Sequence, residues 1–183
     1  MENRELKTYI ALFRGINVGT NNMLPMAELV CLLEALNLHK VRTYVQSGNA
    51  VFKCTEEDAV GLSEKISQAV NQLRGFIPAV LILIPADIER AVAKNPFSQA
   101  DSNPTAVHVG FLAATPIKPN LEKLAQLKNA SEQYFLSERV FYLFAPDGVG
   151  RSKLAAGSEK CLGVAMTDRN WRTVRKIREM AAE

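Results

Sequence analysis

The chain has 183 residues, of which 48% are hydrophobic and 22% charged, and its 22 basic and 19 acidic side chains give a net charge of +3. This composition is typical of a globular protein, and the length corresponds to one large domain or two small ones. It excludes a disordered or collagenous chain. The longest apolar run, residues 79–84, is far shorter than the roughly 18 residues that a membrane span needs.

The beginning of the chain and its cysteines indicate a cellular compartment. The first residues are charged and no apolar segment follows them, so we expect no secretory signal. Cys31, Cys54 and Cys161 are odd in number and widely spaced, without a Cys-x-x-Cys pair. This pattern argues against a disulfide framework and against a zinc site. We therefore expect a cytoplasmic protein that does not contact membranes, and we infer no metal or other cofactor.

The first half of the chain alternates between strand and helix patterns. Helical spacing of apolar residues follows Pro25 and continues again from Ala59 to Leu73, and four strands are predicted at residues 8–13, 41–45, 50–52 and 79–84. The segment Gln46-Ser-Gly-Asn49 between the second and third strands predicts a hairpin. The resulting order, β-α-β-β-α-β with a trailing helix from Pro85, is that of the ferredoxin-like unit.

The second half repeats this order of elements. The predicted strands cover residues 106–112, 133–136, 140–144 and 162–166, and the predicted helices cover 121–127, 150–156 and 169–182. We therefore predict an α+β protein of two ferredoxin-like halves, residues 1–95 and 103–183, in the pattern of an internal duplication. Residues 95–103 form the predicted linker.

The surplus of positive charge lies in the second half. Residues 1–95 carry ten basic and ten acidic side chains, whereas residues 151–178 carry eight basic and two acidic ones, a local net charge of +6. A field of this sign attracts phosphate-bearing ligands. The alternative is a solvated helix face that is rich in arginine.

Five motifs follow one another along the chain: Arg14-Gly-Ile-Asn-Val-Gly19, Pro25-Met26, Tyr44 with Gln46-Ser-Gly-Asn49, Gly150-Arg-Ser-Lys-Leu154, and Thr167 with Arg169-Asn-Trp171 and Thr173. Together they resemble the bacterial domain-of-unknown-function family 1697 over essentially the whole chain. The resemblance implies a cytoplasmic bacterial protein of duplicated α+β architecture. It implies no particular reaction.

Two groups of residues are candidates for binding an anion. In the second half they are Arg151 and Lys153 after a glycine-rich turn, and Arg169 and Asn170 at the predicted start of the closing helix, where backbone N–H groups and the helix dipole favour a phosphate. In the first half they lie at predicted strand ends and in the adjoining loops: Arg14, Asn17, Ser47 and Asn49. The alternatives are that Thr167 or Asp168 only caps the closing helix, and that the two asparagines bond their own turns.

The leading hypothesis is a binding protein for a phosphorylated ligand, either a nucleotide or a nucleic-acid backbone. One alternative is an enzyme that acts on a small phosphorylated substrate with His108 as general base, although we assign no catalytic residue because no known catalytic motif is present. Another is a protein-interaction module that uses a sheet edge or the basic helix. RNA recognition of the RRM type does not fit, because residues 48–53 carry one aromatic side chain where that motif has three.

Overall fold

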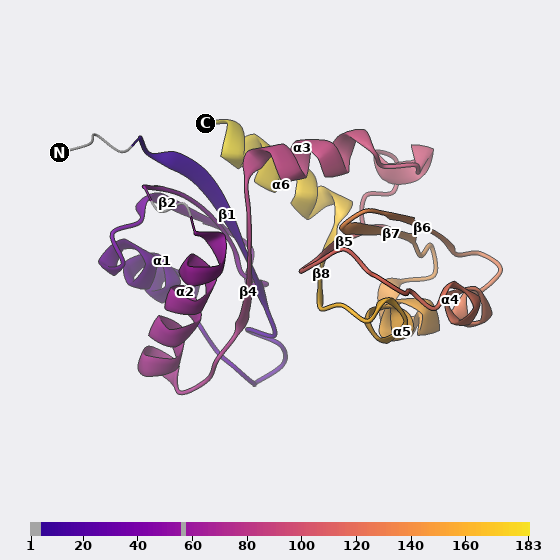
Figure 1. The fold of residues 1–183 in the computed structure, drawn as a ribbon, viewed down its shortest axis with the longest axis horizontal. Coiled ribbons are helices and arrows are strands. Elements are labelled where there is room, and N and C mark those ends of the chain that lie inside the picture. Colours follow the sequence, from indigo (N-terminus) through magenta and orange to yellow (C-terminus); the bar gives the residue numbers. More distant parts are fainter. Residues whose placement is uncertain (1–4, 56–57) are drawn as a thin grey trace. The chain divides into compact units, whose positions relative to one another are not determined.

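The computed structural model describes residues 5–55 and 58–183, and its strands form two four-stranded sheets (Figure 1). The chain divides into two compact units, Met1–Glu89 with Lys176–Glu183, and Arg90–Arg175. Two helices, α3 (Pro85–Ala93) and α6 (Trp171–Ala182), contribute residues to both units. The predicted division at residues 95–103 thus lies a few residues after α3, and the end of α6 belongs to the first unit.

The first unit has the predicted β-α-β-β-α-β order. Its elements are β1 (Lys7–Arg14), α1 (Met26–Ala35), β2 (His39–Tyr44), β3 (Asn49–Cys54), α2 (Ala59–Arg74) and β4 (Ala79–Leu83). The strands lie in the order β2-β3-β1-β4, and all neighbours are antiparallel. This is the ferredoxin-like order, so the predicted fold class is confirmed for this unit.

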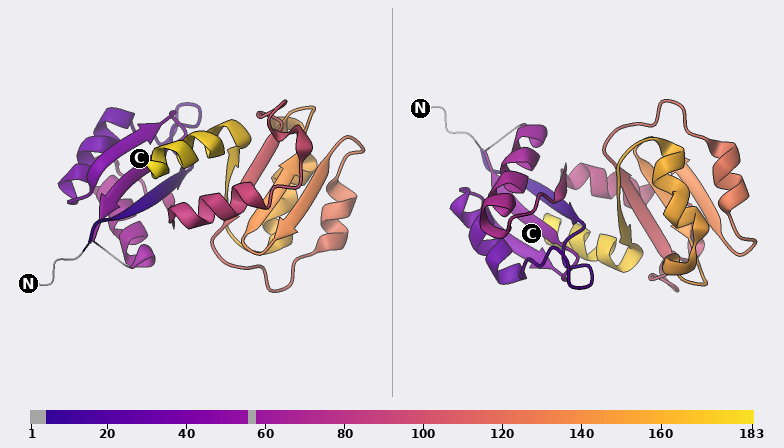
Figure 2. Two further views of the ribbon diagram at one scale, coloured as in Figure 1. Left: turned by 90° about the horizontal axis from the view of Figure 1, so that it is seen from above. Right: turned by 90° about the horizontal axis from the view of Figure 1, so that it is seen from below.

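Strand β1 occupies the middle of the first sheet and is buried on both faces. Tyr9, Ala11 and Phe13 pack into the core that α1 and α2 cover, whereas Ile10 and Leu12 point to the opposite face and are fully buried as well. Figure 2 shows the last turns of α6 lying across this second face. A run of five apolar residues, Tyr9 to Phe13, without polar alternation is therefore what β1 requires.

The second unit repeats the topology with its own strands. Its elements are η1 (Ser98–Ala100), β5 (Val107–Leu112), α4 (Leu121–Leu127), β6 (Gln133–Ser137), β7 (Val140–Phe144), η2 (Val149–Arg151), α5 (Lys153–Leu162) and β8 (Met166–Asn170). The order β6-β7-β5-β8 matches that of the first sheet, strand for strand. Helices α4 and α5 pack on the face of Leu112, Phe141 and Leu143. This result confirms two ferredoxin-like halves.

The last strand lies four residues later than the sequence predicts. Leu162 completes α5, and Gly163 ends that helix in the left-handed conformation, with φ of 68°. Strand β8 then begins at Met166 and runs to Asn170, so the closing helix starts at Trp171 and not at Arg169. The prediction that Thr167 or Asp168 caps this helix is therefore wrong, since both lie within β8. Among the helices of the described residues, none is both long enough and apolar enough to cross a membrane.

Candidate functional site

The candidate residues of the first unit meet at one end of its sheet. Strand β1 ends at Arg14, and β3 begins at Asn49, which lies opposite Leu12 in the register. The N–H of Phe13 donates to the carbonyl of Gly48 at 2.9 Å, which joins the end of β1 to the β2–β3 turn. These two segments therefore lie side by side at this end of the sheet.

Asn17 holds the loop after β1 in place. Its backbone is left-handed, with φ of 53°, a conformation that asparagine tolerates better than most residues. Its side-chain amide donates to the carbonyls of Leu24 (2.9 Å) and Gln46 (2.8 Å), and its side-chain oxygen accepts from the N–H of Leu24 (2.7 Å). The amide thus spans the loop and also ties it to the β2–β3 turn. Its contacts within the chain are those of a bridging residue.

Asn49 closes the β2–β3 turn. It is buried, with 1% of its surface exposed, and its amide donates to the carbonyl of Tyr44 at 2.8 Å and to Oγ of Ser47 at 3.4 Å. The side chains of Arg14 and Ser47 are exposed at the same end of the sheet. Asn17 and Asn49 therefore build a fixed scaffold, and Arg14 and Ser47 are the candidate residues that it presents to solvent.

In the second unit, two cations lie at the start of α5. The turn before the helix contains Gly148, whose φ of 95° favours glycine, and the single turn η2. Ser152 then caps α5 by accepting the N–H of Ala155 at 2.9 Å. Arg151 and Lys153 stand on either side of this cap, and both are exposed.

Arg169 lies on strand β8 and is largely buried, with 8% of its surface exposed. It is opposite Val109 in the register, and Nη1 donates to the carbonyl of Asp168 at 2.7 Å. Burial lowers the pKa of its guanidinium to about 10, against the opposing effect of the Asp168 charge. Arg169 is therefore still protonated at neutral pH.

Asn170, the last residue of β8, caps α6. Its side-chain oxygen accepts the N–H of Thr173 at 3.0 Å. This hydrogen bond satisfies one of the backbone donors that the start of α6 leaves without an intrahelical partner. The side-chain oxygen is therefore engaged in the capping role that the sequence analysis assigned to Thr167 or Asp168.

The sheet brings the starts of α5 and α6 to one end but separates their side chains. Strands β7 and β8 flank β5 and are both antiparallel to it, so both end beside the first residues of β5. Arg169 shares the face of Val109 and Tyr142, whereas α5 covers the face of Leu143. Arg151 and Lys153 therefore form a pair at the start of α5, and Arg169 lies on the other side of the sheet.

His108 binds two acceptors on its own unit. Its Nδ1 is 2.6 Å from Oδ2 of Asp168, and its Nε2 is 3.1 Å from the carbonyl oxygen of Thr105. Burial by itself lowers the pKa of His108, but the hydrogen bond and charge of Asp168, together with the Thr105 carbonyl, raise the pKa above its ordinary value. An imidazolium that donates from both nitrogens fits these contacts, and it offers no lone pair for proton abstraction. The arrangement does not suit a general base.

Asp168 and Thr105 are partners that the sequence analysis missed. Asp168 reaches His108 because β8 pairs with β5, and the predicted strand ended before Asp168. A prediction that extended the last strand to Asn170 would have placed Asp168 beside His108.

A groove of about 670 Å³ lies between α1 and α2 in the first unit. Its lining is mainly apolar, with Cys31, Leu32 and Leu73 among the residues, and Glu28 is its charged member. A phosphate group finds no cation in this lining. Among the described residues, no three His, Cys, Asp or Glu side chains gather in a way that could hold a metal ion.

A family model described as a protein of unknown function (DUF1697) matches residues 6–142. The chain belongs to this family. The matched segment contains Arg14, Asn17, Ser47 and Asn49, and it ends before η2 and α5.

Among solved structures, the chain is similar to that of the conserved bacterial protein SP0830 from Streptococcus pneumoniae. The two are 25% identical with a TM-score of 0.74, and the similarity covers 98% of this chain and 100% of that one. None of the curated protein sequences compared with the chain matches it significantly. The similarities support the α+β fold, and they name no ligand.

Proposed function

We propose that the protein binds a phosphorylated ligand, a nucleotide or a nucleic-acid backbone, at the start of α5. The observation that carries this proposal is the pair of exposed cations, Arg151 and Lys153, on either side of the cap residue Ser152. The first turn of α5 contains no acidic residue. The start of this ten-residue helix therefore combines positive side chains with the positive end of the helix dipole.

Two cations at this position are unfavourable for the helix alone. A charge near a helix terminus changes stability by about 0.3–1 kcal/mol, and at the N-terminus the favourable sign is negative. Arg151 and Lys153 do not cap the helix, since Ser152 does so. A bound anion would neutralise both cations and the dipole together, so a phosphate ligand explains an arrangement that helix stability does not.

The backbone supplies further donors at the same place. The first four N–H groups of a helix have no intrahelical partner. The carbonyl oxygen of Ser152 accepts the N–H of Ala156, and its hydroxyl oxygen accepts the N–H of Ala155. The N–H groups of Lys153 and Leu154 come before these two in the first turn of α5. A phosphate there would accept from the backbone and from the guanidinium of Arg151, whose planar fork binds two oxygens at once.

The other candidate residues play different parts in the structure. Arg169 is buried on the opposite face of the second sheet, and Asn170 caps α6. Arg14 and Ser47 belong to the first unit, where Asn17 and Asn49 hold the loops. The pair at α5 needs no contribution from them.

The test compares the double variant Arg151→Ala/Lys153→Ala with Lys160→Ala, which removes one cation from the last turn of the same helix. Pyrophosphate binding is measured by calorimetry, and binding of a short single-stranded oligonucleotide is measured at about 50 and about 200 mM salt. The double variant is expected to lose about tenfold or more in affinity, as the loss of two charge-assisted contacts implies, with Lys160→Ala within about twofold of the parent.

The salt dependence tells the two ligand sources apart. Each phosphate contact that a cation replaces contributes a slope of about 0.7 for single strands, so two contacts predict about 1.4 for the oligonucleotide in the parent and near zero in the double variant. Pyrophosphate binding without oligonucleotide binding would identify a small phosphorylated ligand. Equal affinities of the parent and the double variant, or a parent that binds neither probe, would refute the proposal.

A further inference from the structure

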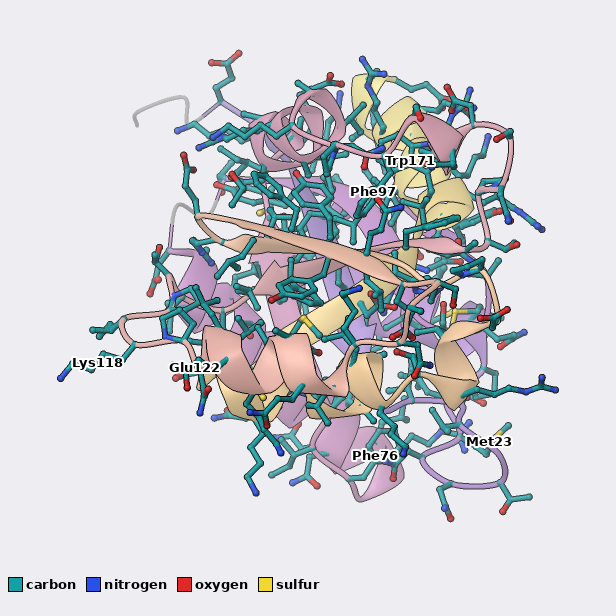
Figure 3. All side chains as sticks on the ribbon, turned by 90° about the vertical axis from the view of Figure 1, so that its right-hand side faces the viewer. Met23, Phe76, Phe97, Lys118, Glu122 and Trp171 are labelled. Atoms are coloured by element: carbon teal, nitrogen blue, oxygen red, sulfur yellow. The ribbon has the colours of Figure 1, made fainter. Side chains whose placement is uncertain are left out.

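Three loops of the first unit gather at one end of its sheet. They are residues 15–25 after β1, the β2–β3 turn at 45–48, and residues 75–78 before β4. They share an end because Arg14 lies opposite Ala79 and Tyr44 lies opposite Asn49 in the registers of the sheet. Figure 1 shows the connections after β1 and before β4 at this end, and Figure 3 labels Met23 and Phe76 there. We call these nineteen residues the loop end.

The loop end carries no charge and exposes apolar side chains. None of its residues is Asp, Glu, Lys or Arg, although these make up 22% of the chain. Large apolar side chains are exposed on all three loops: Val18 by 65%, Met23 by 51%, Val45 by 46% and Ile77 by 72%. Arg14 and the ion pair of Arg74 with Glu28 border it. An uncharged centre with a polar margin is the composition of a protein–protein interface.

Hydrogen bonds fix the shape of the loop end before any partner arrives. Asn17 joins residues 15–25 to the β2–β3 turn, and the side-chain amide of Asn22 donates to the carbonyl of Gly15 at 2.9 Å. A surface that is already ordered loses little conformational entropy on binding. The loop end is therefore an ordered surface and not a set of flexible loops.

Val45 is unfavourable for the stability of the monomer. Its φ of 51° lies in the left-handed region, where a β-branched side chain is strained. Its side chain is also 46% exposed, so little burial offsets the strain. Glycine or asparagine would serve the turn better, as Gly48 does in the same turn with φ of 77°. An apolar side chain that is both strained and exposed points to a role outside the folded monomer.

We propose that the loop end is the surface through which two copies of this chain associate. In a two-fold dimer the same patch meets itself, so a charged patch would face like charges, and this patch carries none. Dimer interfaces between identical chains are also more apolar than transient interfaces with other partners, where charges steer the encounter. Fifteen of the nineteen residues are exposed or half-buried, a patch at the small end compared with the roughly 20–30 residues that a stable interface uses on each side.

The experiment is sedimentation velocity of the full chain over a hundredfold range of protein concentration. The parent is expected to dimerise, with a dissociation constant that changes by less than about twofold between about 50 and about 500 mM salt, because the centre is uncharged. Ile77→Lys is expected to weaken the dimer at least about tenfold, since it buries an unpaired charge. The matched control Ile117→Lys changes an isoleucine that is 92% exposed on the second unit, and it is expected to leave the dimer unchanged.

Val45→Gly separates an interface role from a structural one. It is expected to raise the midpoint temperature of unfolding of the monomer and to weaken the dimer, two effects that a purely structural role would not combine. A parent that stays monomeric at the highest concentration would overturn the proposal. The proposal would also be overturned if Ile77→Lys left the dimer unchanged, or if Ile117→Lys weakened the dimer as much as Ile77→Lys does.

Discussion

Replacing Asp168 by asparagine tests the electrostatics of the second unit. In the parent, the protonated ring of His108 donates to the Asp168 carboxylate at 2.6 Å and to the Thr105 carbonyl at 3.1 Å, and the His108 side chain is only 8% exposed. A hydrogen bond to a charged group contributes about 1.5–3 kcal/mol, so Asp168→Asn is expected to lower the free energy of unfolding by about that amount at pH 6.

The cost depends on pH in a definite direction. Because the folded pKa of His108 is raised above the unfolded value of about 6.5, the contribution of the pair is fully present below that value and is lost as the pH rises through the folded pKa. Once the pH exceeds the folded pKa, the ring is neutral and the attraction between two opposite charges is lost, so the cost of Asp168→Asn is expected to be smaller at pH 9 than at pH 6. In the variant, burial still lowers the pKa of His108 and the Thr105 carbonyl still raises it, but the charge of Asp168 no longer does, so the dependence of stability on pH is expected to weaken.

Urea unfolding followed by tryptophan fluorescence measures this effect, because the sole tryptophan, Trp171, is buried in the same unit. In thermal unfolding the same cost would lower the midpoint temperature. The decrease would be about 4–8 °C for each kcal/mol, the value for a domain of the size of the second unit. In a His108→Gln background, Asp168→Asn is expected to lose its dependence on pH. A cost that is the same at pH 6 and pH 9, or that is larger at pH 9, would refute the reasoning.

Three further changes test individual features, each by calorimetric unfolding. Gly48→Ala combines a left-handed backbone with a Cβ that would lie 2.5 Å from Cδ1 of Ile16, and it is expected to cost about 2–5 kcal/mol; a cost near zero would contradict this packing. Asn17→Ala removes three hydrogen bonds and is expected to cost about 2–3 kcal/mol, and a neutral result would show that the loop does not need its bridge. Burial raises the pKa of Tyr142 to about 12, so its hydroxyl remains a donor to the carbonyl of Ala91 at 2.9 Å. Tyr142→Phe is expected to cost about 1–3 kcal/mol at both pH 7 and pH 10, and a cost confined to pH 7 would contradict the raised pKa.

Hydrophobic patterns predicted most of the fold, and β8 shows where they fail. The first seven strands contain apolar runs or alternation that a sheet requires, and their order alone identified the ferredoxin-like unit. Strand β8, with the sequence Met-Thr-Asp-Arg-Asn, has no such pattern. It is an edge strand that exists through its pairing with β5, a tertiary effect that local sequence does not express.

The misplaced strand also explains what the sequence analysis expected of the candidate site. As helix residues, Arg169 and Asn170 would stand on the first turn of α6 beside its free N–H groups. As strand residues, Arg169 points into the second unit and Asn170 supplies the cap. His108 was expected to face away from the apolar side of its strand, yet it shares the face of Leu112 and Leu143, which α4 and α5 cover, and β5 is buried along its whole length.

The sequence indicates where Asn17 and Asn49 lie, but it does not indicate which hydrogen bonds they form. The proximity of Asn17 and Asn49 follows from the strand order, which places the end of β1 beside the start of β3. Their hydrogen bonds to backbone carbonyls depend on exact loop geometry, which composition and spacing do not define. Arg151 and Lys153 could be found from the sequence because they follow a glycine-rich turn between a predicted strand and a predicted helix, whereas the cap that Ser152 forms between them is visible only in the structure.

The most direct test of phosphate binding at α5 is an amide-resolved NMR titration of the protein with pyrophosphate. Anion binding at the start of the helix is expected to shift the N–H signals of Lys153 and Leu154 most strongly and saturably, while that of Lys160 at the other end of α5 stays in place. Shifts that never saturate, or that appear elsewhere in the chain and spare these two amides, would contradict the account.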